Sequence, residues 1–140
     1  MSTKVFTYGV NSFIVMDMMF TYKVNAFIVF IMEIFFSKGD LQKLCESSRM
    51  MERRLGTACA NKLKRRLADL QAAVTLKHVT AGRPHPLERD RQGQFALCLH
   101  GACRLVFEST DEPIPYNKDG TIAWNEVTKV RIVFIGDYHD

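Results

Sequence analysis

The period of the hydrophobic pattern changes once along the chain, at a pair of prolines, and this change constrains the fold most strongly. Before Arg83, apolar residues recur at the three- and four-residue spacing of helices. After Pro86 they fall into short runs that alternate with polar residues, as strands do. An apolar run at 32–36 precedes the helical part and predicts a first strand. The order predicts an α+β domain, β-α-α-β-β-β, with an antiparallel-rich sheet and an N-terminal helical hairpin packed on one face.

The boundaries of the two predicted helices rest on capping residues. Ser37 followed by Asp40 resembles a capping box and predicts the start of the first helix. Gly56 predicts its end, and Thr57 is the expected N-cap of the second helix. The two helices therefore form a hairpin with a short connection.

Apolar residues at helical spacing give this hairpin a single seam. Cys45 and Cys59 are expected to fill the seam as small hydrophobic residues. A basic face lies opposite the stripe of the second helix and contains Lys62, Arg65 and Arg66. The stripe itself consists of Leu63, Leu67, Leu70 and Val74.

Two apolar runs around His100-Gly101 predict a β-hairpin whose register can be chosen from the side chains. A two-residue loop would place Arg104 among core residues, whereas a three-residue loop with a left-handed Gly101 separates apolar from polar positions. The second register puts Cys98 and Cys103 on opposite faces, which excludes a disulfide between them. Its inward residues are Phe95, Leu97, Cys103, Leu105 and Phe107, and its outward residues are Ala96, Cys98, Ala102 and Arg104.

The remainder of the chain predicts a turn-rich excursion and a last strand. Residues 109–126 contain two prolines and Asp-Gly, and Trp124 is expected to pin this segment to the domain. Residues 127–135 are rich in β-branched side chains. Their alternation predicts Val130, Ile132 and Phe134 on one face of the strand and Arg131, Val133 and Ile135 on the other.

Charge and cysteine content limit the classes of function. Residues 37–91 hold 13 Lys/Arg against 6 Asp/Glu, whereas residues 92–140 hold 4 against 7. The basic middle of the chain favours a phosphate or an acidic protein as partner, or else forms a solvated helix face. The 4 cysteines lack zinc-finger spacing and are too few for a disulfide scaffold, which indicates a reducing, cytoplasmic compartment.

The N-terminal residues form a separate apolar segment. When residues 5–18 are aligned with residues 19–32, nine of the fourteen positions hold identical residues, so the segment is a tandem repeat. Asp17 and Lys23 interrupt it, which argues against a transmembrane helix. We expect residues 1–31 to be an extension outside the fold, a native start at Met32, and one domain over 32–140.

Two strings in the second half resemble the HigB branch of the RelE/ParE superfamily of bacterial type II toxins. They are RPHPLERDRQGQFALCLHGACRLVFE, from Arg83 to Glu108, and the ending VTKVRIVFIGDYHD. The resemblance covers residues 32–140 and implies a RelE-like fold. It also implies a cytoplasmic toxin, held by a cognate helix-turn-helix antitoxin, that cleaves mRNA on the ribosome. Operator DNA would be bound only through the antitoxin complex, and no metal or other cofactor is implied.

The resemblance also carries site residues onto this chain. Arg104 matches the arginine of the second hairpin strand, Tyr138 and His139 match a C-terminal Tyr-His pair, and His85 matches the histidine of the H-x-L-x-x-D-R segment. A lysine is common in the family three residues after that histidine, where this chain has Glu88. The missing cation would then come from Arg89 or Arg91.

These residue types suit cleavage of RNA by its own 2′-hydroxyl. Histidine can act as base or acid, and arginine presents a fork of donors to phosphate oxygens. We therefore predict Arg104 as phosphate clamp, His85 and His139 as the acid–base pair in either order, and Tyr138 as a positioning or stacking residue. Lys62, Arg65 and Arg66 are candidates for ribosomal RNA contacts. A ParE-like inhibitor of DNA gyrase and a catalytically weak RNA-binding relative remain alternatives, because a fold does not fix a function.

Overall fold

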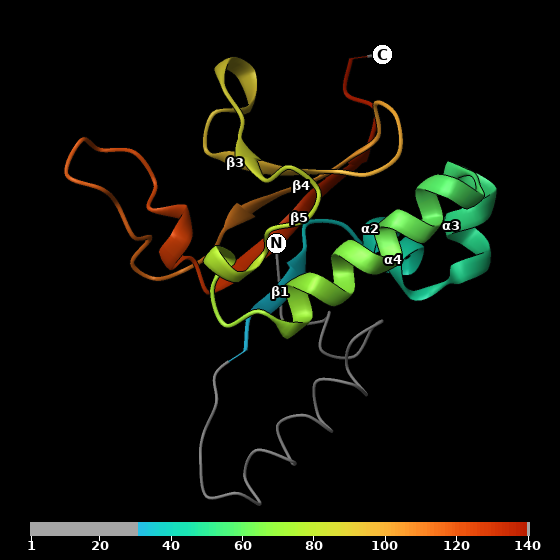
Figure 1. Ribbon diagram of the computed structural model, residues 1–140, viewed down its shortest axis with the longest axis horizontal. Helices are drawn as coiled ribbons and strands as arrows, with labels where there is room; N and C mark the ends of the chain where they lie inside the picture. The colour runs from blue at the N-terminus through green and yellow to red at the C-terminus, as the bar shows by residue number, and fades with distance from the viewer. Residues whose placement is uncertain (1–30, 140) are drawn as a thin grey trace, which may run out of the picture.

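Residues 31–139, which the computed structural model describes, form an α+β fold with a five-stranded mixed sheet (Figure 1). The predicted repeat lies outside these residues except at its C-terminal end. The strand order is β1-β5-β4-β3-β2; β1 runs parallel to β5, and the other neighbours are antiparallel. This topology confirms the antiparallel-rich sheet, but the predicted order of four strands is wrong, because the extended segment at His85–Pro86 pairs with β3 as a fifth strand. The strands are β1 (Glu33–Phe36), β2 (His85–Pro86), β3 (Gln94–Cys98), β4 (Arg104–Ser109) and β5 (Lys129–Gly136).

The helical part contains three helices, so the prediction of two is wrong. Ser47 has an extended backbone and divides the first segment, and its Oγ accepts a hydrogen bond of 3.2 Å from the Met50 N–H. A serine side chain at this position satisfies a first-turn amide, which favours a new helix start. The helices are α2 (Gly39–Glu46), α3 (Ser48–Leu55) and α4 (Thr57–Ala72).

The observed caps differ from the predicted ones. Lys38 is the N-cap of α2 and makes no side-chain cap bond, so Ser37 does not form the predicted capping box. Gly56 ends α3 and is also the N-cap of α4, which places Thr57 inside the helix rather than at its cap. Gly56 has a φ of +81°, a conformation that glycine adopts without steric cost.

The helices cover one face of the sheet, and the core lies between them (Figure 1). Leu63, Leu67 and Leu70 are at most 2% exposed, which confirms the predicted stripe for these positions. Val74 is 40% exposed because α4 ends two residues earlier, so its assignment to the stripe is wrong. Cys45 and Cys59 are buried in the core as predicted.

The β3–β4 hairpin has the predicted register. Phe95 pairs with Phe107, and Cys98 pairs with Arg104. The Leu99 N–H donates to the Cys103 carbonyl at 2.9 Å, which closes a loop of three residues. Gly101 lies in that loop with a φ of +59°, as the bulged turn requires.

A bulge in β5 reverses the predicted alternation at the end of the strand. Val106 pairs with Phe134 while the next residue, Phe107, pairs with Ile132, so Val133 is an extra residue. An extra residue exchanges the faces of all positions beyond it. Ile135 consequently packs against the core, and Phe134 contacts other side chains on the opposite face.

The face of the sheet opposite the helices, here called the outer face, carries the polar residues of the hairpin. Ala96, which was predicted to point outward, is fully buried there, as is Val106. Beyond β4, the turn-rich excursion extends away from the helices (Figure 1). Trp124 pins it to the sheet as predicted, with its ring 4.7 Å from that of Phe95.

Candidate functional site

A cavity of about 380 Å³ opens at the loop end of the hairpin, at the edge of the outer face. It brings together His85 from β2 and Arg104 from β4, which are nineteen residues apart in the sequence. None of the lining residues is acidic, so the cavity attracts anions. The lining consists of Arg83, Pro84, His85, Cys98 and Arg104.

The tautomer of His85 is set by its neighbour. The His85 Nδ1 lies 2.7 Å from the Arg83 carbonyl oxygen. Because a carbonyl oxygen can only accept, Nδ1 carries the proton in the neutral ring and Nε2 keeps its lone pair. Arg83 itself has a φ of +48°, which is uncommon for a residue with a side chain. His85 therefore offers a basic nitrogen to a bound group.

Arg104 is held over the hairpin loop by main-chain oxygens. Its Nη1 donates to the Gly101 carbonyl at 2.8 Å and to the Cys103 carbonyl at 3.0 Å. Within residues 31–139 no carboxylate lies at ion-pair distance from Arg104. Among residues 31–139, the guanidinium is thus oriented by uncharged partners, which suits it to contact an anion.

The C-terminal residues begin beside Arg104, because Gly136 is its pairing partner in β5. The rings of Tyr138 and His139 lie 4.6 Å apart, and the Tyr138 ring lies 6.1 Å from that of Phe134. The His139 N–H donates to Asp137 Oδ1 at 2.9 Å, which forms a local turn. The predicted Tyr-His pair thus follows the strand residue that pairs with Arg104, but neither Tyr138 nor His139 lines the cavity of His85 and Arg104.

Arg91 connects the segment after β2 to the C-terminal aromatic residues. Its guanidinium carbon lies 4.8 Å from the centre of the Phe134 ring and 4.9 Å from that of Tyr138. Its Nη1 donates to Gln94 Oε1 at 2.9 Å. Cation–π contacts of this kind orient an aromatic ring. The contact joins residues that only the tertiary fold brings together, so no local sequence pattern predicts it.

The two candidate substitutes for the family lysine occupy different places. Arg91 reaches Tyr138, whereas Arg89 lines a separate groove together with Glu88. The Glu88 side chain accordingly does not line the cavity of His85 and Arg104. A carboxylate at this position therefore leaves the cationic character of the cavity intact.

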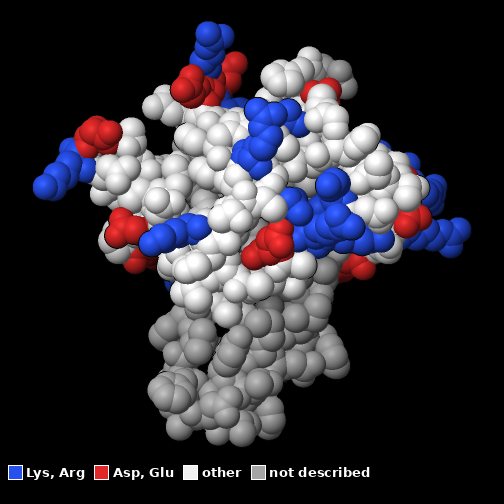
Figure 2. Space-filling model, viewed as in Figure 1, with Lys and Arg blue, Asp and Glu red and all other residues white. Residues whose placement is uncertain are grey.

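The basic face of α4 is exposed at Lys62 and Arg65 but not at Arg66. Arg66 Nε lies 3.1 Å from Asp69 Oδ2, and only 12% of the Arg66 side chain is exposed. The Arg66 Cδ would lie 3.0 Å from a Cβ placed on Gly82, so Arg66 and Gly82 are in close contact. Arg66 therefore supports the segment before β2. Figure 2 shows Lys and Arg side chains gathered over α4.

The cysteines are free thiols in the part of the chain that the structure describes. Cys103 packs against the core while Cys98 lines the outer cavity, which confirms their predicted placement on opposite faces. Burial and a hydrogen bond with Cys59 raise the pKa of Cys103 to about 12. Cys103 therefore stays protonated at neutral pH, and Cys98 is the thiol nearest the candidate site.

Comparison of the sequence with models of known protein families and with curated proteins finds no match. No helix within residues 31–139 has both the length and the apolar character needed to cross a membrane. The same residues contain no group of three or more His, Cys, Asp and Glu side chains arranged to hold a metal ion. The geometry of the outer cavity is therefore the main guide to function.

Proposed function

We propose that this chain is a RelE-fold toxin of the HigB branch, which acts in the cytoplasm and cleaves mRNA on the translating ribosome. The proposal rests on the cavity in which His85 and Arg104 meet without an acidic residue in the lining. A concave cationic surface attracts a phosphodiester, and the free Nε2 of His85 supplies the proton acceptor that RNA cleavage needs. The sequence resemblance independently selects the same two residues.

The proposed reaction uses the 2′-hydroxyl of the RNA as the nucleophile. A base removes the hydroxyl proton while the 2′-oxygen forms a bond to phosphorus. The bond from phosphorus to the 5′-oxygen then breaks, and an acid gives that oxygen a proton. His85 and His139 supply the base and the acid, and Arg104 stabilises the negative charge on the phosphorus oxygens. The products are a 2′,3′-cyclic phosphate and a 5′-hydroxyl end.

The aromatic residues next to the cavity would position the RNA. Tyr138 presents a ring beside His139, and Arg91 stabilises that ring through its guanidinium. Bases of single-stranded RNA stack on such rings. Tyr138 therefore acts as a positioning residue and Arg91 as its support.

The proposed partners follow from the same assignment. A helix-turn-helix antitoxin would hold the toxin and bring it to operator DNA. On the ribosome, the exposed Lys62 and Arg65 of α4 would contact ribosomal RNA, because surface cations bind phosphates largely without regard to sequence.

Replacement of Arg104 tests the proposal in cells. Expression of the full chain should arrest growth and leave mRNA cut within translated codons. Arg104→Ala should lower cleavage by two to three orders of magnitude, because a well-placed donor to developing charge contributes about 3 to 4 kcal/mol. Lys43→Ala, at an exposed position of α2 outside the proposed RNA contacts, is the matched control and should cleave like the parent.

Three results would contradict the assignment. Equal loss of cleavage in folded Arg104→Ala and Lys43→Ala proteins would remove Arg104 from the site. Growth arrest with intact mRNA and inhibited gyrase would support the ParE-like alternative. RNA binding without cleavage would indicate a catalytically weak relative.

A further inference from the structure

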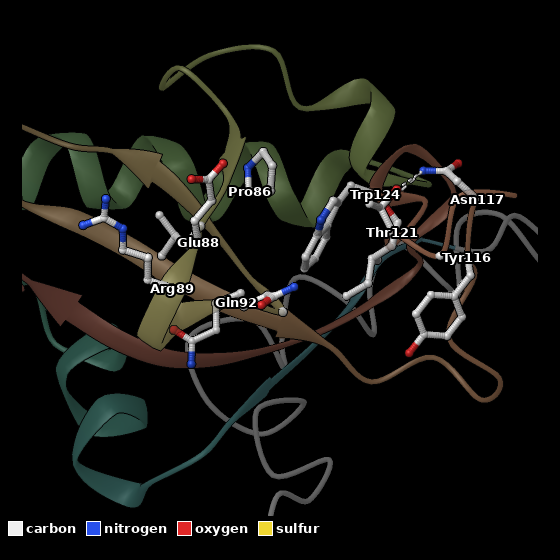
Figure 3. A pocket seen from close by; sticks show the side chains of 13 residues that line it. Pro86, Glu88, Arg89, Gln92, Tyr116, Asn117, Thr121 and Trp124 are labelled. Carbon is white, nitrogen blue, oxygen red and sulfur yellow. Dashed lines mark hydrogen bonds between the residues drawn. The ribbon is translucent and has the colours of Figure 1, made fainter.

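A second and larger groove lies between the segment after β2 and the turn-rich excursion. Its volume is about 770 Å³, within the range of ligand-binding clefts. Figure 3 shows the lining side chains of the two segments, with Glu88, Arg89 and Gln92 on one side and Tyr116, Asn117 and Trp124 on the other. The residues that matter here are Glu88, Arg89, Gln92, Tyr116, Asn117 and Trp124.

The groove presents aromatic surface to solvent. Tyr116 is 60% exposed and is one of two exposed large hydrophobic residues among residues 31–139; the other is Val74. Trp124 packs against Phe95, and its indole also lines the groove (Figure 3). A flat apolar ligand would cover surface that is otherwise in contact with water.

The same groove has groups that recognise a polar edge. Asn117 Nδ2 donates to Thr121 Oγ1 at 3.0 Å, which fixes the amide and leaves Oδ1 as an acceptor. Gln92 lines the groove as a second amide. Arg89 and Glu88 both line the groove, so their charges balance, and Arg89 has a φ of +55°, a strained conformation that is frequent at ligand sites. A nucleobase has a flat face and a polar edge of this kind, so it matches the aromatic and amide groups together.

The groove is adjacent to the candidate cleavage cavity through the edge strand β2. His85 pairs with Ala96 and lines the cavity, while the next residue, Pro86, pairs with Phe95 and lines the groove. An extended strand of RNA that crosses β2 would therefore pass from one site to the other. The chain would hold a phosphate in the cavity and bases in the groove.

We propose that this groove binds bases of single-stranded RNA that flank the phosphate held at His85 and Arg104. The inference rests on the proposed ribonuclease function and extends it to a site for substrate bases. Stacking on Tyr116 and Trp124 supplies binding, and the two amides contact base edges.

Trp124 reports directly on the groove, because it is the chain's only tryptophan. We would titrate the full chain with a short single-stranded 2′-O-methyl oligoribonucleotide of mixed sequence, which cannot be cleaved through a 2′-hydroxyl. Its binding should quench the Trp124 fluorescence. A duplex of the same sequence should quench far less, because its bases are already stacked on each other.

Substitutions at exposed apolar positions give a matched comparison. Tyr116→Ala should weaken binding of the oligonucleotide about tenfold or more, as expected for loss of one stacked base. Tyr116→Phe should retain binding, because it retains the ring. Val74→Ala truncates the other exposed large hydrophobic residue, outside the groove, and should leave binding unchanged.

The outcomes separate this inference from the proposed function. Binding of a labelled oligonucleotide can also be followed by fluorescence polarisation. If it binds without changing the Trp124 fluorescence, and with the same affinity in Tyr116→Ala, the groove assignment is overturned. The nuclease assignment would still hold if mRNA cleavage continues to depend on Arg104. Quenching that depends on Tyr116, in a protein that cleaves no mRNA, would support the groove and overturn the nuclease. Fluorescence that responds to a protein partner and not to the oligonucleotide would also overturn the inference.

Discussion

At the scale of single residues, the candidate site depends on groups whose partners are main-chain oxygens. The Arg83 carbonyl selects one tautomer of His85, and two loop carbonyls orient Arg104. Carbonyl partners fix direction without supplying a counter-charge, so both side chains keep the capacity that an anionic substrate requires. An arginine paired with a carboxylate, such as Arg131 with Glu108, lacks that freedom.

His85→Asn should separate orientation from proton transfer. An asparagine amide can donate to the Arg83 carbonyl from the position of Nδ1, but it has no basic nitrogen in the place of Nε2. We expect unchanged thermal stability and a fall of about 10²- to 10⁴-fold in the rate of mRNA cleavage on programmed ribosomes. A folded variant that cleaves within about threefold of the parent would show that His85 transfers no proton, since a general base contributes far more than that.

At the scale of elements, local signals predicted some boundaries and not others. The hairpin register was predictable because Arg104 interrupts an apolar run and Gly101 marks the left-handed position of the loop. The bulge at Val133 was not predictable, because β5 is apolar on both faces there. A change in which side chains face the core therefore leaves no trace in the sequence. The break at Ser47 was missed because helical spacing of apolar residues continues across it.

Two serines test which residue starts a helix. Ser47→Ala should lower the free energy of unfolding by about 1 kcal/mol, because it removes the bond that caps α3. Ser37→Ala should change it by less than about 0.5 kcal/mol, because Ser37 provides no cap for α2. Urea denaturation of the two variants measures both values. A larger loss at Ser37 than at Ser47 would restore the capping box predicted from the sequence.

At the scale of the whole molecule, the fold divides packing and chemistry between the two faces of the sheet. The helices bury one face, and the edge of the other carries the cationic cavity with the C-terminal aromatic residues beside it. Hydrophobic periodicity predicted the class of fold and the buried face. Only the family resemblance predicted that His85 and Arg104 belong to one site. The contact of Arg91 with Tyr138 depends on a tertiary arrangement that no local pattern encodes.

The chemistry of the cut ends tests the central claim most directly. Purified full chain would be incubated with ribosomes translating a defined mRNA, and the new ends would be mapped and tested for phosphorylation by a kinase. We expect cuts within translated codons, with 5′-hydroxyl and 2′,3′-cyclic phosphate ends, that require translation and disappear in Arg104→Ala. Intact mRNA, or cuts that leave 5′-phosphate ends, would contradict the account.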